Sequence, residues 1–334
     1  MAFTAGGGGA PRPISLSHQQ VLHRTAATIA ANGWTSDERT FNAFPLHHVS
    51  GLLLFHVRDT WLGVDQGMAP RGRVVAQPQD LLDGIDTMRA TLSWSTPGVL
   101  DRLTHELETG DRPLALGSLH TVLVGGDRLL GRQRHRIARL LGVREAAIVP
   151  GFGFTEAGSG ITHGGGQLTA TGLTSVGEPE PGTAVRVARP NGCDMGRLEV
   201  SGPSLSDDGT WHDTGDVATI LDRQLVVHGR FEDVVEIEGS PLHLADIEAV
   251  ARCLDWKRPD AITATREDGG IALHVHSADV TAPAMGRVRG LLRDRVGAEV
   301  VAIRSLVGEG PPMSHHGRLL RSALRADPPA AVPL

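Results

Sequence analysis

The chain has 334 residues, of which 21% are charged, and its formal net charge is -6. This length is enough for about two domains, and the mild negative charge excludes a general attraction to nucleic acid or to an anionic membrane. Two cysteines give no disulfide framework, the N-terminus lacks the pattern of a secretory signal, and no apolar run could cross a bilayer, so we expect a cytoplasmic protein without a nucleic-acid or membrane partner.

The first half of the chain alternates the patterns of strands and helices. Residues 1–13 are small and Gly-rich, which indicates a loop with no strand before it. A capping box, Ser17 with Gln20, predicts a helix that ends at Gly33, and Pro97 begins another. The buried face expected for the first helix comprises Val21, Leu22, Thr25, Ala26 and Ile29. Other apolar runs lie at 51–57, 93–95, 121–124, 129–141 and 146–149. The alternation predicts a layered α/β core.

The second half of the chain has shorter elements. From Ser175 we expect strands at 185–187 and 197–200 and a hairpin over 217–227. Beyond Arg230 the pattern predicts a compact unit, with helices at 245–252 and 285–296 and strands at 261–265, 271–275 and 298–303. The tail after Asp327 is rich in Pro and Ala and is expected to be disordered.

Two groups of polar residues stand out beside these elements. Thr155 and Glu156 follow an apolar strand, and a hydroxyl with a carboxylate at a strand end can face a phosphate and its Mg²⁺; an ordinary glycine turn is the alternative. Asp216 precedes the hairpin and Arg230 follows it, so that a carboxylate and a guanidinium could hold a ribose diol. A plain turn with a surface ion pair is the alternative there.

These motifs resemble the adenylate-forming superfamily, which contains acyl-CoA synthetases, adenylation domains of peptide synthetases and luciferases. The match extends over Trp211–Glu248, including Gly229-Arg230. In that family the Asp and the Arg, here Asp216 and Arg230, hold the ribose of ATP or AMP. The chain pivots two residues beyond the Arg, which corresponds to Glu232 here.

The resemblance also implies roles for other residues. Phe152 and Gly153 match the aromatic-Gly motif beside adenine, in which Thr155 contacts phosphate and Glu156 helps to hold Mg²⁺. His48, in Pro45–Gly51, matches a histidine of the acyl pocket, and Gly126 matches a glycine between that pocket and adenine. A metal site at His47 and His48 is not expected, because adjacent side chains do not share one face of a helix or a strand.

Three departures from the family pattern are present. The phosphate loop corresponds to residues 4–12, where Gly6 and Gly9 remain but most hydroxyls are absent and Arg12 replaces lysine. The terminal motif has Arg318 at its lysine position, and a planar guanidinium is not equivalent to an ammonium group. The region that precedes the phosphate loop in relatives is missing.

The resemblance therefore predicts an α/β fold that consists of a truncated adenylate-forming core with a small β-subdomain and a C-terminal α+β lid. We expect the core at residues 1–229 without the usual N-terminal subdomain, a hinge at 230–232, a mobile C-terminal subdomain at 233–326 and a disordered tail at 327–334.

The implied function is ATP-dependent activation of a small carboxylic acid as an acyl-adenylate, with transfer to CoA, to the phosphopantetheine thiol of a carrier protein, or to an amine. The pocket segments suggest a small aromatic or short apolar acid. The alternatives are an ATP-independent acyl-thioester transferase, a catalytically degenerate partner of a companion subunit, and a nucleotide-binding module. A homodimer is left open.

Overall fold

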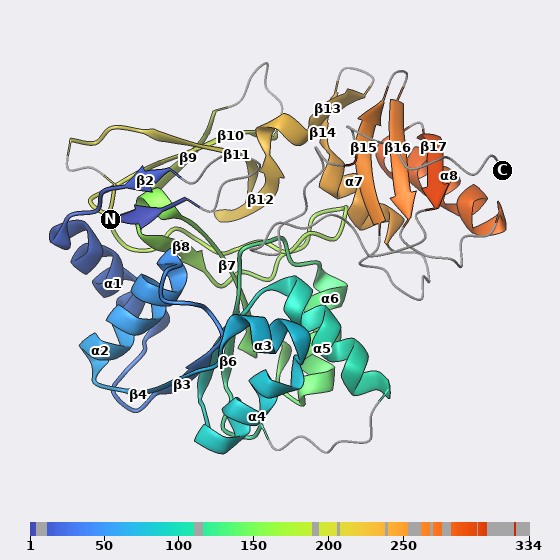
Figure 1. The fold of residues 1–334 in the computed structure, drawn as a ribbon. Coiled ribbons are helices and arrows are strands. Elements are labelled where there is room, and N and C mark those ends of the chain that lie inside the picture. The colour runs from blue at the N-terminus through green and yellow to red at the C-terminus, as the bar shows by residue number, and fades with distance from the viewer. Residues whose placement is uncertain are drawn as a thin grey trace.

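The computed structural model describes residues 1–4, 12–109, 116–188, 194–205, 208–237, 240–252, 262–267, 270–275, 282–298, 300–305 and 324. Three larger sheets organise this part of the chain (Figure 1). None of the described helices has the length and apolar character needed to cross a membrane.

The central sheet has six strands in the order β4-β3-β5-β6-β7-β8. Their bounds are β3 (Arg39–Asn42), β4 (Asp65–Met68), β5 (Leu92–Ser95), β6 (Thr121–Val124), β7 (Ile148–Phe154) and β8 (Ser159–His163). The first five strands in that order pair in parallel, and β8 is antiparallel to β7. Because parallel strands end at the same edge of a sheet, the segments that follow β3 to β7 collect there, where α/β folds bind ligands.

Helices cover both faces of this sheet. The alternation of side chains along β6 sends Val122 and Val124 into one core, which also includes Leu103 and Ile137, and sends Leu123 into another with Trp94. The first core lies under α3 (Arg71–Ala76), α4 (Gln79–Met88), α5 (Pro97–Thr109) and α6 (Gly131–Leu141). On the opposite side lie α1 (His18–Asn32), the π-helix η1 (Ser50–Val57) and α2 (Arg58–Leu62) (Figure 1).

A four-stranded antiparallel sheet follows, in the order β12-β11-β10-β9. Its strands are β9 (Ala184–Ala188), β10 (Gly196–Ser201), β11 (His212–Leu221) and β12 (Gln224–Arg230). Leu198, Ala218 and Leu225 pack with Ile161 of β8, so this sheet shares a core with the edge of the central one. A short pair, β1 (Ala2–Phe3) and β2 (Pro13–Ile14), lies near the N-terminus.

The last described elements form what we call the C-terminal unit, residues 234–305. A 3₁₀ turn, Phe231–Asp233, leads into it from β12. Its elements are β13 (Val234–Ile237), β14 (Ser240–His243), α7 (Leu244–Ala251), β15 (Ile262–Glu267), β16 (Gly270–Val275), α8 (Ala282–Val296) and β17 (Val300–Ser305). Residues such as Ile247, Leu273 and Leu292 give it a hydrophobic core of its own, at one end of the molecule in Figure 1.

Most element types predicted from sequence agree with the structure, but the predicted loop at 1–13 contains β1 and the start of β2, and the buried face of α1 was only partly correct. Ser17 caps the helix and Gly33 ends it in a left-handed conformation, as expected. Thr25 is buried as predicted, but Leu22 is 47% exposed and Ala26 is also exposed. Arg24 and Thr28, which were not predicted, are buried instead. The apolar run at 51–57 is helical. Five elements were not predicted from the sequence, namely β4, α2, α3, α4 and β8.

Glu180 is the physical reason for the polar face of α1. Its carboxylate pairs with Arg24, accepts a hydrogen bond of 2.7 Å from the Thr28 hydroxyl, and contacts Nδ1 of His163 on β8. Burial alone would raise the pKa of Glu180, but His163 and Arg24 outweigh it and the pKa lies below its ordinary value. The helix is therefore attached to β8 through charge rather than through an apolar stripe.

Substitution of Glu180 tests this attachment. Glu180→Gln should lower the free energy of unfolding by about 3–5 kcal/mol, because it leaves the buried Arg24 without its counter-charge. Glu178→Gln is the matched control, since Glu178 pairs with Arg223 at the surface and should change stability by less than about 1 kcal/mol. Urea unfolding measures both, and equal effects would contradict the buried role.

Candidate active site

Asp216 and Arg230 lie directly opposite each other in the pairing of β11 with β12. The Arg230 Nε atom is 3.6 Å from Asp216 Oδ1, and one Nη donates to the Thr214 carbonyl at 2.8 Å. The Arg230 side chain is 42% exposed and that of Asp216 is 14% exposed. The structure therefore brings the two residues together, with a shielded carboxylate beside an accessible guanidinium, as a diol-binding couple requires.

Gly229 allows this register. The pairing shifts by one residue between Val217 and Ala218, and Gly229 has a φ of 136°, which a residue with a side chain rarely adopts. A Cβ atom at Gly229 would also lie 2.7 Å from the His243 ring. The backbone conformation of β12 and the nearby His243 ring therefore require a glycine immediately before Arg230.

Thr155 and Glu156 begin a 3₁₀ turn, Thr155–Ala157, directly after β7. Arg12 reaches Glu156 from the N-terminal pair of strands, with 3.4 Å between Nη2 and Oε1. Thr4 and Arg12 exchange a backbone hydrogen bond of 2.9 Å. Our expectation that no strand precedes the glycine-rich segment was wrong, because β1 and β2 pair with each other on either side of it.

Phe152 and Gly153 lie on β7 where it pairs with β8. Phe152 is half-buried and packs with the core shared by β8 and the four-stranded sheet. A Cβ atom at Gly153 would lie 2.2 Å from the Ser159 carbonyl oxygen, so only glycine fits this approach of the two strands. The glycine is needed by the fold whatever its neighbour binds.

His48 and Gly126 lie after β3 and β6, at the same edge of the sheet. The His48 ring is 5.3 Å from that of Phe44, and its Nδ1 accepts a hydrogen bond from the Ser50 amide at 3.2 Å. Gly126 has a φ of 84°, and a Cβ at its neighbour Gly125 would be 3.5 Å from the Trp94 indole nitrogen. Aromatic rings thus line the space that these two residues border.

Three predicted residues, Gly6, Gly9 and Arg318, lie outside the described residues. Within the described residues no group of three or more His, Cys, Asp or Glu side chains could hold a metal ion. Glu156 is a single carboxylate beside the Thr155 hydroxyl, and oxygen donors of this kind fit Mg²⁺, which binds proteins through one or two carboxylates and takes further ligands from phosphates and water. A nucleotide-bound Mg²⁺ therefore fits this position.

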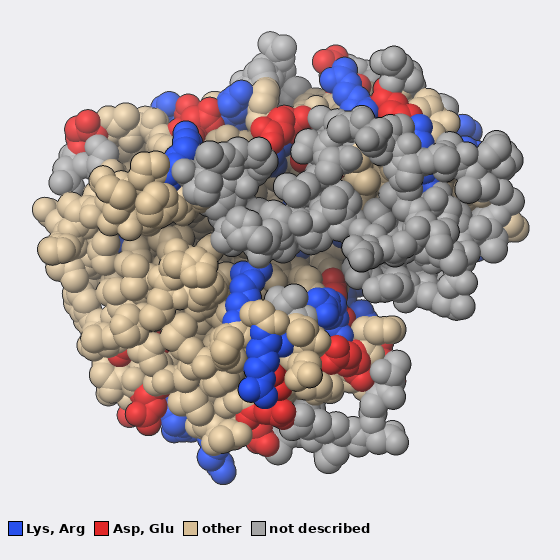
Figure 2. Space-filling view, viewed as in Figure 1, with Lys and Arg blue, Asp and Glu red and all other residues tan. Residues whose placement is uncertain are grey.

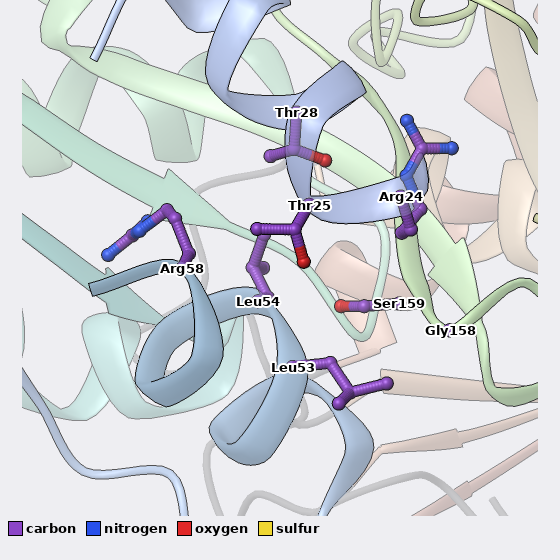
Figure 3. A pocket seen from close by; sticks show the side chains of 8 residues that line it. All are labelled: Arg24, Thr25, Thr28, Leu53, Leu54, Arg58, Gly158 and Ser159. Carbon is purple, nitrogen blue, oxygen red and sulfur yellow. The ribbon is translucent and has the colours of Figure 1, made fainter. Parts of the chain in front are cut away.

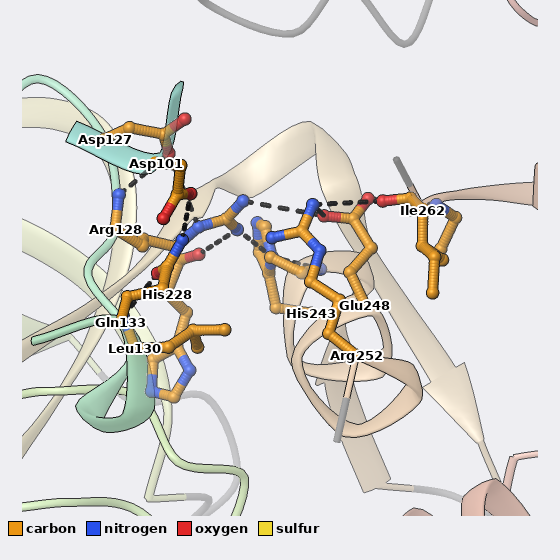
Figure 4. A network of polar contacts seen from close by, with 12 residues as sticks. Asp101, Asp127, Arg128, Leu130, Gln133, His228, His243, Glu248, Arg252 and Ile262 are labelled. Carbon is orange, nitrogen blue, oxygen red and sulfur yellow. Dashed lines mark hydrogen bonds and ion pairs between the residues drawn. The ribbon is translucent and has the colours of Figure 1, made fainter. Parts of the chain in front are cut away.

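A polar network that the sequence did not predict joins the site to the C-terminal unit (Figure 4). Arg128 donates to the His228 carbonyl at 2.8 Å and is 3.7 Å from the buried Glu248 carboxylate. His243 accepts the Ala245 amide at Nδ1, so its Nε2 donates to the Arg230 carbonyl at 3.0 Å. The backbone of the proposed ribose-binding arginine is thus fixed by the first turn of α7.

Asp246 completes this joint from α7. Its carboxylate contacts His228 Nδ1 at 2.9 Å and accepts the Thr171 hydroxyl at 2.9 Å. Burial would raise the pKa of Asp246, but the hydrogen bond and charge of His228 outweigh it and the pKa lies below its ordinary value. The family resemblance extends to Asp246 and Glu248 but assigned them no role, and the packing of α7 against β12 shows what they contact.

The cavity in Figure 3 is not a candidate ligand site. It lies between α1, the helical segment at 50–62 and β8, and is lined by Thr25, Leu54 and Ser159 among others. Its volume of about 10 Å³ holds at most one water molecule. In Figure 2 basic side chains are exposed over α3.

Comparison with known proteins identifies the family. The model of the family described as AMP-binding enzyme matches residues 1–207. The chain belongs to this family. The prediction of the adenylate-forming superfamily and of its α/β fold is thereby confirmed.

Individual relatives are more distant. Aspulvinone E synthetase of Aspergillus terreus is 28% identical in an alignment 282 residues long, and this alignment covers 74% of this chain and 30% of that protein. A solved structure of a keto acid-selecting module of a nonribosomal peptide synthetase matches with a TM-score of 0.80 and 22% identity. The match covers 97% of this chain and 32% of that chain. The structure of McyG A-PCP complexed with phenylalanyl-adenylate matches with a TM-score of 0.78 and 23% identity. This match covers 97% of this chain and 57% of that chain. The chain therefore spans about 30% of the length of the curated relatives it matches.

The Asp246 carboxylate should make the joint sensitive to acid. Its folded pKa is depressed, so its stabilising effect is present above the ordinary pKa of an aspartate and is lost as the pH falls through the folded value. Asp246→Asn should be less stable than the unaltered chain at about pH 7 and should lose less stability as the pH is lowered below the ordinary aspartate pKa.

Unfolding by urea at each pH measures this difference. Asp65→Asn, at an exposed position of β4, is the control and should follow the unaltered chain. A parallel loss of stability in Asp246→Asn and the unaltered chain would show that Asp246 contributes nothing to the acid response.

Proposed function

We propose that this chain activates a small carboxylic acid with ATP, forming an acyl-adenylate and releasing pyrophosphate. The observation that supports this most is the pairing of Asp216 with Arg230 beside the C-terminal unit. The Asp216 carboxylate accepts the ribose hydroxyls, and Arg230 supplies donors to the same diol.

The phosphates lie toward Glu156, Thr155 and Arg12 in this proposal. Thr155 donates its hydroxyl to a phosphate oxygen, and Glu156 holds the Mg²⁺ that neutralises charge on the triphosphate. Arg12, whose side chain is 75% exposed, turns from Glu156 to the β- and γ-phosphates. The exposed guanidinium can make this change at little cost, because a surface ion pair contributes about 1 kcal/mol or less.

The reaction is an in-line displacement. A carboxylate oxygen of the acid attacks the α-phosphorus; the new oxygen–phosphorus bond forms as the bond to pyrophosphate breaks, and pyrophosphate leaves with the electron pair. Arg318 and Arg12 stabilise the developing negative charge. His48 and Gly126 border the acyl group. A thiol or an amine then attacks the acyl carbon and AMP leaves.

We propose a carrier-protein phosphopantetheine thiol as the acceptor in preference to CoA, since the similar McyG structure contains an A-PCP. The joint at residues 230–232 serves as a hinge between a core at 1–229 and a lid at 233–326, with 327–334 as a tail. Domain rotation about a few residues is a common way to exchange two half-reactions at one site. We place the reaction in the cytoplasm, which suits a chain with only two cysteines.

A second candidate is an ATP-independent acyl-thioester transferase or an inactive partner subunit. The composition favours it, because the single lysine of the chain is Lys257 and arginine stands at positions 12 and 318. An inactive atromentin synthetase of Paxillus involutus is 24% identical to this chain. Acyl transfer from a thioester in the absence of ATP would establish this candidate instead.

Asp216→Asn tests the first proposal. Loss of the charged acceptor should raise the dissociation constant for ATP about 10- to 100-fold, since a hydrogen bond to a charged group contributes about 1.5–3 kcal/mol. Calorimetry measures ATP binding, and pyrophosphate exchange with a panel of acids measures activation.

Asp222→Asn is the matched control. Asp222 lies in the turn between β11 and β12 with a φ of 45°, which asparagine also tolerates. It should bind ATP like the unaltered chain. An unaltered chain that binds no ATP and exchanges pyrophosphate with no acid would contradict the proposed function.

A further inference from the structure

Arg71 lies at the ligand-binding edge of the central sheet, beyond the carboxyl end of β4. The Ala69 amide donates to the Asn42 carbonyl at 3.0 Å, so the chain stays beside β3 after β4 ends. Pro70 then caps α3, whose first residue is Arg71. Arg71 therefore lies at the same edge of the sheet as His48 and Gly126.

The Arg71 guanidinium rests on an aromatic wall. Its central carbon is 5.2 Å from the centroid of the Phe44 ring. The same ring packs against Trp94 and lies 5.3 Å from the ring of His48. Trp94 in turn approaches Gly125, the neighbour of Gly126. Arg71 is thus connected through two rings to the residues that border the acyl group in the proposed function.

The environment of Arg71 differs from that of Arg73, two residues along α3. Arg73 pairs with Asp80 and its side chain is 67% exposed, as is usual for a surface arginine. Arg71 is half-buried, and this burial lowers the pKa of its guanidinium, although an arginine remains charged at neutral pH. A cation held in a partly desolvated aromatic setting attracts an anion more strongly than one in bulk water.

We propose that Arg71 is a specificity-determining residue that binds a second carboxylate of the substrate, so that the acid activated by this chain is a dicarboxylic acid. The inference rests on the proposed function. One carboxylate reacts with the α-phosphorus, and the other pairs with Arg71, whose planar guanidinium matches a carboxylate through two parallel hydrogen bonds. This adds a second carboxylate to the small aromatic or short apolar acid that we expect from the sequence.

The alternative is a structural role, in which Arg71 holds α3 in place through contacts such as the cation–π contact with Phe44. Such a role predicts no preference among acids. A substrate with a distal positive charge is disfavoured by either arrangement, because the guanidinium would repel it.

Matched substrates separate the two roles. A nitro group has the shape of a carboxylate without its charge, so succinate is compared with 3-nitropropionate and isophthalate with 3-nitrobenzoate. Pyrophosphate exchange gives kcat/KM for each acid. We expect at least one dicarboxylate to exceed its nitro analogue about 10-fold or more.

Substitutions locate the preference. Arg71→Met should lower kcat/KM for the dicarboxylate about 10- to 100-fold, mainly through KM for the acid, with no loss for the nitro analogue. Arg71→Lys should recover part of the preference, because it keeps the charge but not the bidentate geometry. Arg73→Met is the control and should resemble the unaltered chain.

The outcomes are distinguishable. If the nitro analogues react as well as the dicarboxylates, or if Arg71→Met lowers both equally, the inference is wrong and the proposed function stands. If no acid supports exchange, the proposed function and the inference fail together.

Discussion

The register between β11 and β12 is the constraint on which the candidate site depends. A slip of one residue would turn every side chain of a strand to the opposite face, so Asp216 and Arg230 face the same space only in the observed pairing. Gly229 makes this register available, and the His243 ring occupies the room that a side chain there would need. The pairing of Asp216 with Arg230, which we propose binds ribose, and the attachment of the C-terminal unit are therefore consequences of one backbone arrangement.

Strand β12 also connects the proposed nucleotide site with the C-terminal unit. The Arg230 guanidinium belongs to the proposed ribose site, while its carbonyl accepts the hydrogen bond of His243. Arg128, from the loop after β6, holds the preceding segment of β12 and faces Glu248 of α7. These contacts to the C-terminal unit use the carbonyl of Arg230 and the side chains of Arg128 and His228. They leave the Asp216 carboxylate and the Arg230 guanidinium, the groups of the proposed ribose site, paired with each other.

Much of the fold could be predicted from the sequence because local signals determine it. The capping box at Ser17, the helix start at Pro97 and the apolar strand at 121–124 each depend on neighbours within a few residues. Asp216, Arg230, Thr155 and Glu156 could be proposed because their motifs are contiguous with such elements.

The features that were missed depend on contacts between distant residues. The polar face of α1 follows from Glu180, which is more than 150 residues away from Arg24 and Thr28. Arg128 and Arg71 follow loops or strands without a recognisable pattern, and their surroundings exist only once the parallel sheet has formed. The two N-terminal strands are too short to give a periodic signal, so their pairing was equally inaccessible.

The aromatic wall beneath Arg71 also determines how the molecule can be observed. The chain has five tryptophans and no tyrosine, so its ultraviolet emission comes from indole rings alone. Trp94 is almost fully buried between Phe44 and Phe55, close to the glycines after β6. An acid that enters this space changes the polarity around one indole, which makes Trp94 an internal fluorescent reporter of acyl-group occupancy that requires no attached dye.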